Sequence, residues 1–257
     1  MEPHRWSWRS WWRPPSARGL LFAAVVLVLT CGALAVVKPA GAAVTASVRD
    51  VPGPAVGWSS EPAGLVDPAR IGGAAPVLAV VGASFAAGVG AAGPHMGWPY
   101  LLARLEGWRV IVSADPGAGF LNPGAHRLGP LARLVGRLDL ARLNPSMVIV
   151  QGGYNDVGRS PAAVASQVAA LFGSIRRSAP HARLGLVSVF SVGAGPTRTA
   201  VALDRTIIAA ARKADPAVVV FDPLAERWVF PRIGDDLHPS PAGHAWIAAR
   251  IEQDLRR

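Results

Sequence analysis

The feature that most constrains the fold is a regular alternation of short apolar runs with longer stretches of helical character. The runs lack strict polar alternation, as expected for strands buried on both faces of a sheet. They are PVLAVV ending at Val81, WRVIV ending at Val112, MVIV ending at Val150, LGLVSVF ending at Phe190 and AVVVF ending at Phe221. Helices are predicted at His95 to Leu105, Gly129 to Leu143, Pro161 to Ala179, about Thr199 to Ala214, and Pro241 to Leu255. This alternation predicts an α/β fold, a three-layer α/β/α sandwich with a mostly parallel five-stranded sheet.

The residues before this predicted domain, which spans 76–257, have a different composition. Residues 1–18 are basic and rich in Trp, residues 19–37 carry no charge, and residues 38–75 are rich in Pro, Gly and Ala, as in a linker. The uncharged run is long enough for a transmembrane signal anchor, since 19 residues cover about 28 Å as a helix. The preceding arginines place the N-terminus in the cytoplasm and the domain across the membrane. The alternative is a cleaved signal peptide, with small residues at 40–42 as its cleavage site. Both predict a domain outside the cytoplasm, membrane-anchored or secreted.

Composition excludes some function classes. The formal net charge is +10, but the arginines are scattered and no basic run is interleaved with aromatic residues, so nucleic acid is not expected as a partner. Cys31 is the single cysteine, which excludes an internal disulfide and a cysteine-based metal site. We expect a monomer without cofactor or metal, whose fold depends on its apolar core.

The loops that follow the predicted strands carry the residues suited to chemistry. In parallel sheets, ligands bind beyond the carboxyl ends of the strands, so these loops should converge. They read GASFAAG, SADPGAG and QGGYNDVG, and the stretch GDDLHPSPAGH follows the last strand at some distance. Together they supply a serine, glycines, an asparagine and an Asp/His pair, which are the parts of a serine esterase.

Each of these residues also has a purely structural interpretation. Ser84 is either the nucleophile or the cap of the following helix. His238, with Asp235 three residues earlier, is either the general base or an ordinary loop histidine ahead of the last helix. Asn155 either donates to an oxyanion or holds its own turn, and Gly117 either offers a backbone N–H or only shapes its loop. Their joint occurrence at the predicted strand ends favours the catalytic interpretation.

In four blocks the sequence resembles the SGNH hydrolases, also called GDSL-type lipases and esterases. The blocks are VVGASFAAG around Ser84, PGAG around Gly117, GYND at Gly153 to Asp156 and DDLH at Asp235 to His238. The resemblance covers about Pro76 to Arg257 and implies a flavodoxin-like fold.

The same resemblance implies a role for each matched residue. It makes Ser84 the nucleophile, His238 the base and Asp235 the partner of that base. The oxyanion donors that it implies are the backbone N–H groups of Ser84 and Gly117 and the side chain of Asn155, with Gly119 as the alternative to Gly117. The expected activity is hydrolysis of an ester such as an acetylated glycan, a lipid or another small ester.

One departure from the family pattern concerns the serine turn. Ala83 stands where the family usually has Asp, so a polar contact that would help to hold the turn is missing. Either activity is reduced or the turn is supported differently, and the alternative function is a catalytically weakened or inactive binding or scaffold domain. Trp228 and Phe230 are predicted near the same sheet edge, either lining the substrate pocket or packing in the core.

Two rival sites are weaker. Gly88 to Gly93 reads GVGAAG and Asp115 follows, as in a dinucleotide-binding fingerprint. However, the glycines start some six residues after the end of the first predicted strand, and Pro94 interrupts the helix that should begin there. Asp235, Asp236, His238 and His244 could be metal ligands, but the two histidines do not share a helix face. Asp236 and His244 are therefore predicted bystanders, with His244 in the exposed first turn of the last helix.

Overall fold

The computed structural model of the protein describes residues 75–193 and 195–257. The predicted N-terminal basic segment, membrane anchor and linker lie outside these residues. Within the described part of the chain, no helix has both the length and the apolar character needed to cross a membrane.

A five-stranded sheet forms the centre of the domain, and all of its strand pairs are parallel. Its strands are β1 (Val77–Gly82), β2 (Arg109–Ala114), β3 (Met147–Gln151), β4 (Arg183–Val187) and β5 (Val219–Phe221). The order β2-β1-β3-β4-β5 is that of flavodoxin-like sheets. Every residue of β1 and β3 is buried, which explains why both sequences are apolar except for Gln151 at the end of β3. The predicted fold class is confirmed.

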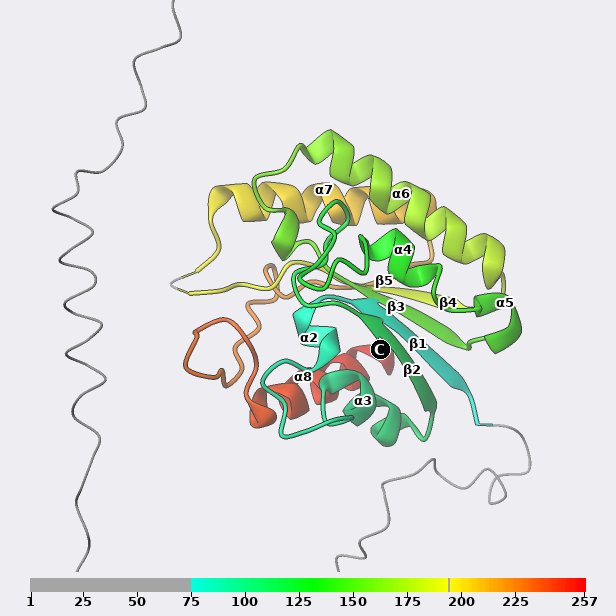
Figure 1. Ribbon diagram of the computed structural model, residues 1–257, viewed down its shortest axis with the longest axis horizontal. Helices are drawn as coiled ribbons and strands as arrows, with labels where there is room; N and C mark the ends of the chain where they lie inside the picture. The colour runs from blue at the N-terminus through cyan, green and yellow to red at the C-terminus, as the bar shows by residue number, and fades with distance from the viewer. Residues whose placement is uncertain (1–74, 194) are drawn as a thin grey trace, which may run out of the picture. The chain divides into compact units, whose positions relative to one another are not determined.

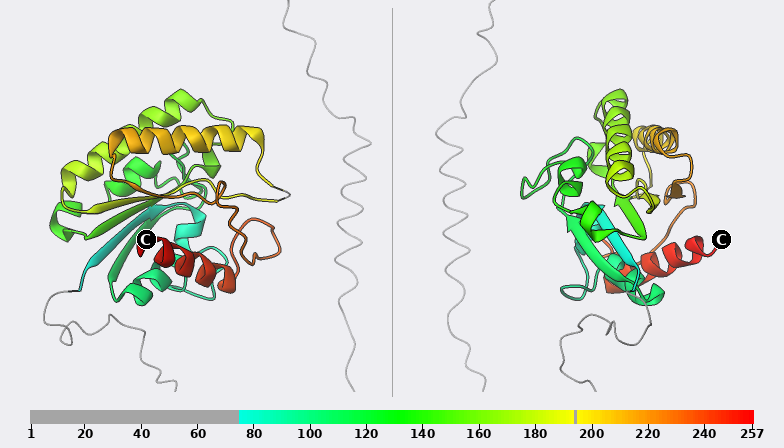
Figure 2. Two further views of the ribbon diagram at one scale, coloured as in Figure 1. Left: turned by 180° about the vertical axis from the view of Figure 1, so that it is seen from behind. Right: turned by 90° about the vertical axis from the view of Figure 1, so that its right-hand side faces the viewer.

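Helices cover both faces of the sheet and complete the three layers (Figure 1). They are α2 (Ser84–Ala87), α3 (Trp98–Glu106), α4 (Leu131–Val135), α5 (Leu140–Leu143), α6 (Pro161–Ser178), α7 (Arg198–Ala214) and α8 (Pro241–Leu255). Helices α4, α5, α6 and α7 lie on one face and α2, α3 and α8 on the other, as the views in Figure 2 also show. Each face has its own core, one around Phe172 and Ile175 and the other around Trp98 and Ile247.

Three predicted elements differ from the structure. The helix expected at 129–143 is two short helices, α4 and α5, because α4 ends at Val135 with Gly136 as its C-cap and Asp139 caps a new helix by accepting from the Arg142 N–H. The helix expected from His95 starts at Trp98, since His95 has a left-handed φ of 61°. The fourth strand ends at Val187, not Phe190, because the Val189 N–H turns to the Asp204 carboxylate.

Candidate active site

The predicted nucleophile lies on a tight turn between β1 and α2. Ser84 is the first residue of α2, and Ala83 before it takes the N-cap position without a side-chain cap. Ser84 therefore does not cap the helix, and no described residue hydrogen-bonds its hydroxyl or its backbone N–H. Gly88 ends the helix after one turn with a φ of 83°. The short helix presents both polar groups of Ser84 beyond the carboxyl end of β1.

Ser84 lines a cavity of about 250 Å³ at this edge of the sheet. The other predicted site residues that line it are Gly117, Asn155 and His238. Further lining residues are Ala83, Phe85, Pro116, Ala125, Gln151, Gly152, Tyr154, Phe190 and Leu237. The structure thus brings to one cavity four residues that are up to 154 positions apart in the sequence (238 − 84 = 154).

Asp235 lies behind His238 and orients its ring. The Asp235 Oδ2 is 2.5 Å from His238 Nδ1, and its Oδ1 accepts from the backbone N–H groups of His238 and Leu237 at 2.9 and 3.0 Å. The hydrogen bond from the His238 ring, followed by those two N–H groups, lowers the pKa of Asp235 to about 2. An ionised carboxylate at this position favours a proton on Nδ1 and leaves Nε2 as the acceptor. Nε2 is the atom that a general base needs.

The glycine and asparagine blocks are joined to each other beside the cavity. The Asn155 side chain donates an Nδ2 hydrogen bond of 2.8 Å to the Ala118 carbonyl, and its amide has a second N–H. Gly117 has a φ of 79°, which glycine adopts without strain, and its N–H has no acceptor among the described residues. The Gly119 N–H instead donates to the Asn122 carbonyl at 3.0 Å. Gly117, rather than Gly119, is left with a donor at the cavity.

Asp156 fixes the loop that carries Gly117, a role that the sequence did not suggest. Its buried carboxylate accepts from the backbone N–H groups of Phe120, Leu121 and Asn122 at 2.7, 3.0 and 3.3 Å. A Cβ on Gly119 would lie 2.4 Å from Asp156 Oδ2, so this position must stay glycine. The aspartate of the GYND block therefore holds the PGAG block in place.

Gln151, at the end of β3, supports the serine turn. Its Oε1 accepts from the Ala83 N–H at 3.1 Å and from the Ala86 N–H at 3.3 Å. Sequence reasoning missed this residue, although a polar residue that ends an otherwise apolar strand is a signal that could have found it. The turn with Ala83 in place of the family's Asp is thus supported from a neighbouring strand.

The aromatic residues near His238 divide between core and cavity. Trp228 and Phe230 are buried in the core and do not line the cavity, whereas Phe190 does. The Phe85 ring stacks on Phe190 at 4.4 Å between centroids and contacts the His238 ring at 5.8 Å. This cluster limits the positions that the imidazole can take.

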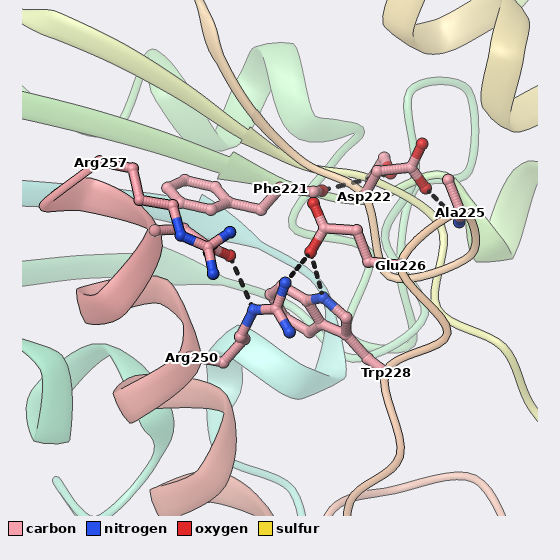
Figure 3. A network of polar contacts seen from close by, with 9 residues as sticks. Phe221, Asp222, Ala225, Glu226, Trp228, Arg250 and Arg257 are labelled. Atoms are coloured by element: carbon pink, nitrogen blue, oxygen red, sulfur yellow. Dashed lines mark hydrogen bonds and ion pairs between the residues drawn. The ribbon is translucent and has the colours of Figure 1, made fainter.

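A polar network anchors the start of the segment that leads to His238 (Figure 3). Glu226 Oε2 accepts from Trp228 Nε1 at 2.8 Å and from Arg250 Nη2 of α8 at 2.5 Å. The Arg250 guanidinium also lies 5.5 Å from the centre of the Trp228 ring. The loop between β5 and α8 is therefore tied to α8 ahead of the Asp/His pair.

The prediction for His244 was wrong, because this residue is fully buried. Its Nδ1 accepts from the Trp98 N–H at 3.2 Å, and its Nε2 donates to the Val89 carbonyl at 3.0 Å. Burial lowers the pKa of His244, which favours the neutral ring that these two bonds require. His244 thus joins α8 to the segment between α2 and α3. Asp236, by contrast, is exposed.

The residues of the rival sites have other structural roles. Asp115 is buried and accepts from the backbone N–H groups of His126 and Leu128 at 3.3 and 3.2 Å, so its carboxylate holds a loop. Gly88 and Gly90, both with positive φ, shape the segment after α2. Within residues 75–193 and 195–257 no group of three or more His, Cys, Asp or Glu side chains could hold a metal ion.

The parallel sheet brings Ser84, Gly117, Asn155 and the Asp235/His238 pair to one edge. This is the arrangement of groups found in hydrolases that use a serine nucleophile. The sequence profile of the GDSL-like Lipase/Acylhydrolase family matches residues 80–246. The chain belongs to this family, the SGNH or GDSL hydrolases, and this confirms the resemblance seen in the sequence. No curated protein sequence matches the chain.

Solved structures share the fold at low sequence identity. A family two carbohydrate esterase from Cellvibrio japonicus aligns with a TM-score of 0.58 and 18% identity, over 70% of this chain and 60% of that one. An acetyl xylan esterase from Butyrivibrio proteoclasticus gives 0.54 and 14%, over 70% and 63%. A protein of Desulfitobacterium hafniense, assigned to the G-D-S-L family of lipolytic proteins, gives 0.56 and 15%, over 70% and 99%. The chain thus spans under two thirds of the two carbohydrate-active esterases and nearly all of the third protein.

Proposed function

We propose that the protein is a serine esterase that works outside the cytoplasm with Ser84, His238 and Asp235 as its triad. The observation that carries the proposal is that Ser84 and His238 line one small cavity while Asp235 Oδ2 lies 2.5 Å from His238 Nδ1. Gly117 and Asn155 line the same cavity as donors. Membership in a lipase and acylhydrolase family supports the proposal.

The proposed reaction has two steps. Ser84 Oγ attacks the ester carbonyl while His238 Nε2 takes its proton, and the oxyanion accepts from the N–H groups of Ser84 and Gly117 and from Asn155 Nδ2. The intermediate collapses to an acyl-enzyme, and the leaving alcohol takes the proton from His238. Water then attacks the acyl carbon and gives a proton to His238. The second tetrahedral intermediate collapses, His238 passes that proton to Ser84 Oγ, and the acid leaves. Asp235 keeps the imidazole oriented and stabilises its cation throughout.

The cavity supports a short acyl group in the substrate. Its volume of about 250 Å³ lies below the usual range for small-molecule pockets. A second cavity of about 360 Å³ shares Tyr154, Asn155 and Phe190 with it and offers room for the alcohol part of the ester. We therefore propose an O-acetylated envelope glycan, an ester class that the likeness to carbohydrate esterases also favours.

The location rests on residues 1–37 alone. An N-terminal membrane anchor or signal peptide would carry the domain across the membrane, as the basic segment and the uncharged run predict. Added protease should then degrade the domain in intact cells and spare a cytoplasmic marker. Resistance of the domain in intact cells, with degradation after lysis, would contradict this location.

Hydrolysis of p-nitrophenyl esters tests the activity and the acyl preference. We expect turnover of the acetyl ester, with kcat/KM falling as the acyl chain lengthens. Ser84→Ala and His238→Ala should abolish it, while Ser166→Ala and His181→Ala, at exposed positions outside the cavity, should not. Equal turnover by Ser84→Ala would refute the proposed nucleophile, and absence of turnover in the wild type on every ester would favour a binding domain.

A further inference from the structure

Gln151 gives the serine turn a hydrogen-bond acceptor that the side chain of its own N-cap residue does not provide. The first N–H groups of a helix have no acceptor within the helix, and a side chain at the N-cap usually supplies one. Ala83 at the N-cap of α2 has no side-chain oxygen to offer. Gln151 Oε1, from β3, accepts from the Ala86 N–H, which an N-cap side chain would normally bind, and also from the Ala83 N–H. Ser84 lies between these two anchored residues.

The orientation of the Gln151 amide follows from its partners. A backbone N–H can only donate, so the atom that faces both of them must be the oxygen, and Nε2 is the other end of the amide. Both hydrogen bonds that join the Gln151 side chain to described residues are made by Oε1, which leaves Nε2 without an acceptor among them. Gln151 is 96% buried, with 4% of its surface exposed, and it lines the cavity that Ser84 and His238 share. A Cβ on Gly82 would lie 2.9 Å from Gln151 Oε1, so the turn and the amide are closely fitted.

We propose that Gln151 is a positioning residue that holds Ser84 in the geometry needed for attack. It binds both flanks of the turn, so it fixes the backbone that carries the Ser84 hydroxyl and the Ser84 N–H at the cavity that His238 also lines. This inference rests on the proposed function. It also explains how the chain does without the family's Asp at position 83, because the acceptor reaches the turn from the neighbouring strand.

The neutrality of the amide is part of the inference. A carboxylate at position 151 could accept the same two N–H groups, but its negative charge would lie beside the oxyanion that forms during attack. An ionised group in this buried place would raise the energy of that intermediate. Glutamine supplies the acceptor without the charge.

Two variants of the full chain separate these effects. Gln151→Met keeps the length of the side chain and removes the acceptor, and Gln151→Glu keeps the acceptor and adds an ionisable group. Gln253→Met, at an exposed position of α8, is the matched control. The readouts are kcat and KM for p-nitrophenyl acetate over a range of pH, the rate of labelling by a fluorophosphonate, and the melting temperature.

Gln151→Met should lower kcat by about tenfold or more with KM nearly unchanged, and the labelling rate should fall with kcat, since small misplacements of a reacting group are costly. For Gln151→Glu, the ratio of its kcat to that of the wild type should fall as pH rises and the new carboxyl ionises. If Gln151 only stabilised the fold, its replacement would lower the melting temperature. The kcat per labelled site of Gln151→Met, and the pH dependence of the kcat ratio for Gln151→Glu, would then match those of the wild type.

A folded Gln151→Met protein with wild-type kcat and labelling rate would overturn the inference. If Gln151→Met does not fold, Gln151→Glu decides alone, and a ratio close to one at every pH would overturn it. Failure of the proposed function looks different, because the wild type itself would then resist labelling or Ser84→Ala would be labelled equally well.

Discussion

Replacing Asp235 with asparagine tests whether the Asp/His pair sets the tautomer of the proposed base. The Asp235 carboxylate now accepts from His238 Nδ1 at 2.5 Å, which places the ring proton on Nδ1. An asparagine could keep its oxygen on the backbone N–H groups of Leu237 and His238, which Asp235 Oδ1 accepts at present. Its Nδ2 would then face the ring and donate to Nδ1, which moves the ring proton to Nε2. In that tautomer His238 cannot take the proton of Ser84.

The size of the effect follows from the exposure of the pair. In serine proteases with a buried aspartate, the same replacement lowers kcat by about 10⁴-fold. The Asp235 side chain is 42% exposed and the His238 side chain 17%, so water can partly replace the lost interaction. We therefore expect kcat for p-nitrophenyl acetate to fall by about 10²-fold to 10³-fold with little change in KM.

Asp236→Asn is the matched control for this experiment. Asp236 is exposed and has a φ of 55°, a conformation that asparagine tolerates, so its replacement should leave kcat within about twofold of the wild type. A loss in Asp236→Asn that equals or exceeds the loss in Asp235→Asn would refute the assignment of the orienting carboxylate.

Three further predictions concern ionisation and loop support. Since the pKa of Asp235 is about 2, below its ordinary value, the carboxylate stays ionised across the working range, and its protonation should not contribute to the acid limb of kcat/KM. The contribution of Asp235 to stability should be complete above about pH 4 and lost as pH falls toward 2, as urea unfolding at several pH values would show. Asp156→Ala leaves three backbone N–H groups without their acceptor, so it should lower the free energy of unfolding in urea by about 3 kcal/mol and also lower kcat. Because burial lowers the pKa of His244, the free energy of unfolding should decrease as pH falls below about 6.5. His244→Ala should make this pH dependence weaker. An unchanged slope of the free energy of unfolding against pH in His244→Ala would contradict the buried neutral ring.

Much of the fold could be predicted because strand burial leaves a direct trace in the sequence. The run that forms β1 is apolar throughout, the run that forms β3 is apolar up to Gln151, and Pro241 after Ser240 marks the start of α8 at the predicted residue. The break between α4 and α5 was missed because Leu138 continues the helical spacing of Leu131, Leu134 and Val135 across it, and only Gly136 and the capping Asp139 mark it. Local patterns thus predict elements better than they predict interruptions within them.

For the candidate site, the sequence indicated which residues gather at the sheet edge but not what holds them there. The cavity is lined by Ser84, Gly117, Asn155 and His238. Each of them lies in the segment that follows a strand of the parallel sheet, and these segments meet at the carboxyl ends of the strands. The carboxylate of Asp156 and the amide of Gln151 act on backbone N–H groups 34 to 68 residues away, and no local spacing encodes such bonds. The burial of His244 was missed for the same reason, because its partners Val89 and Trp98 are distant in sequence.

The central claim is that Ser84 is a nucleophile activated by His238, and the site of a covalent adduct tests it most directly. The full chain would be treated with a fluorophosphonate, digested and mapped by mass spectrometry. We predict one adduct, on the peptide that contains Ser84, that is absent in Ser84→Ala, strongly reduced in His238→Ala and unchanged in Ser166→Ala. An adduct on another residue, or one that persists in Ser84→Ala, would contradict the account.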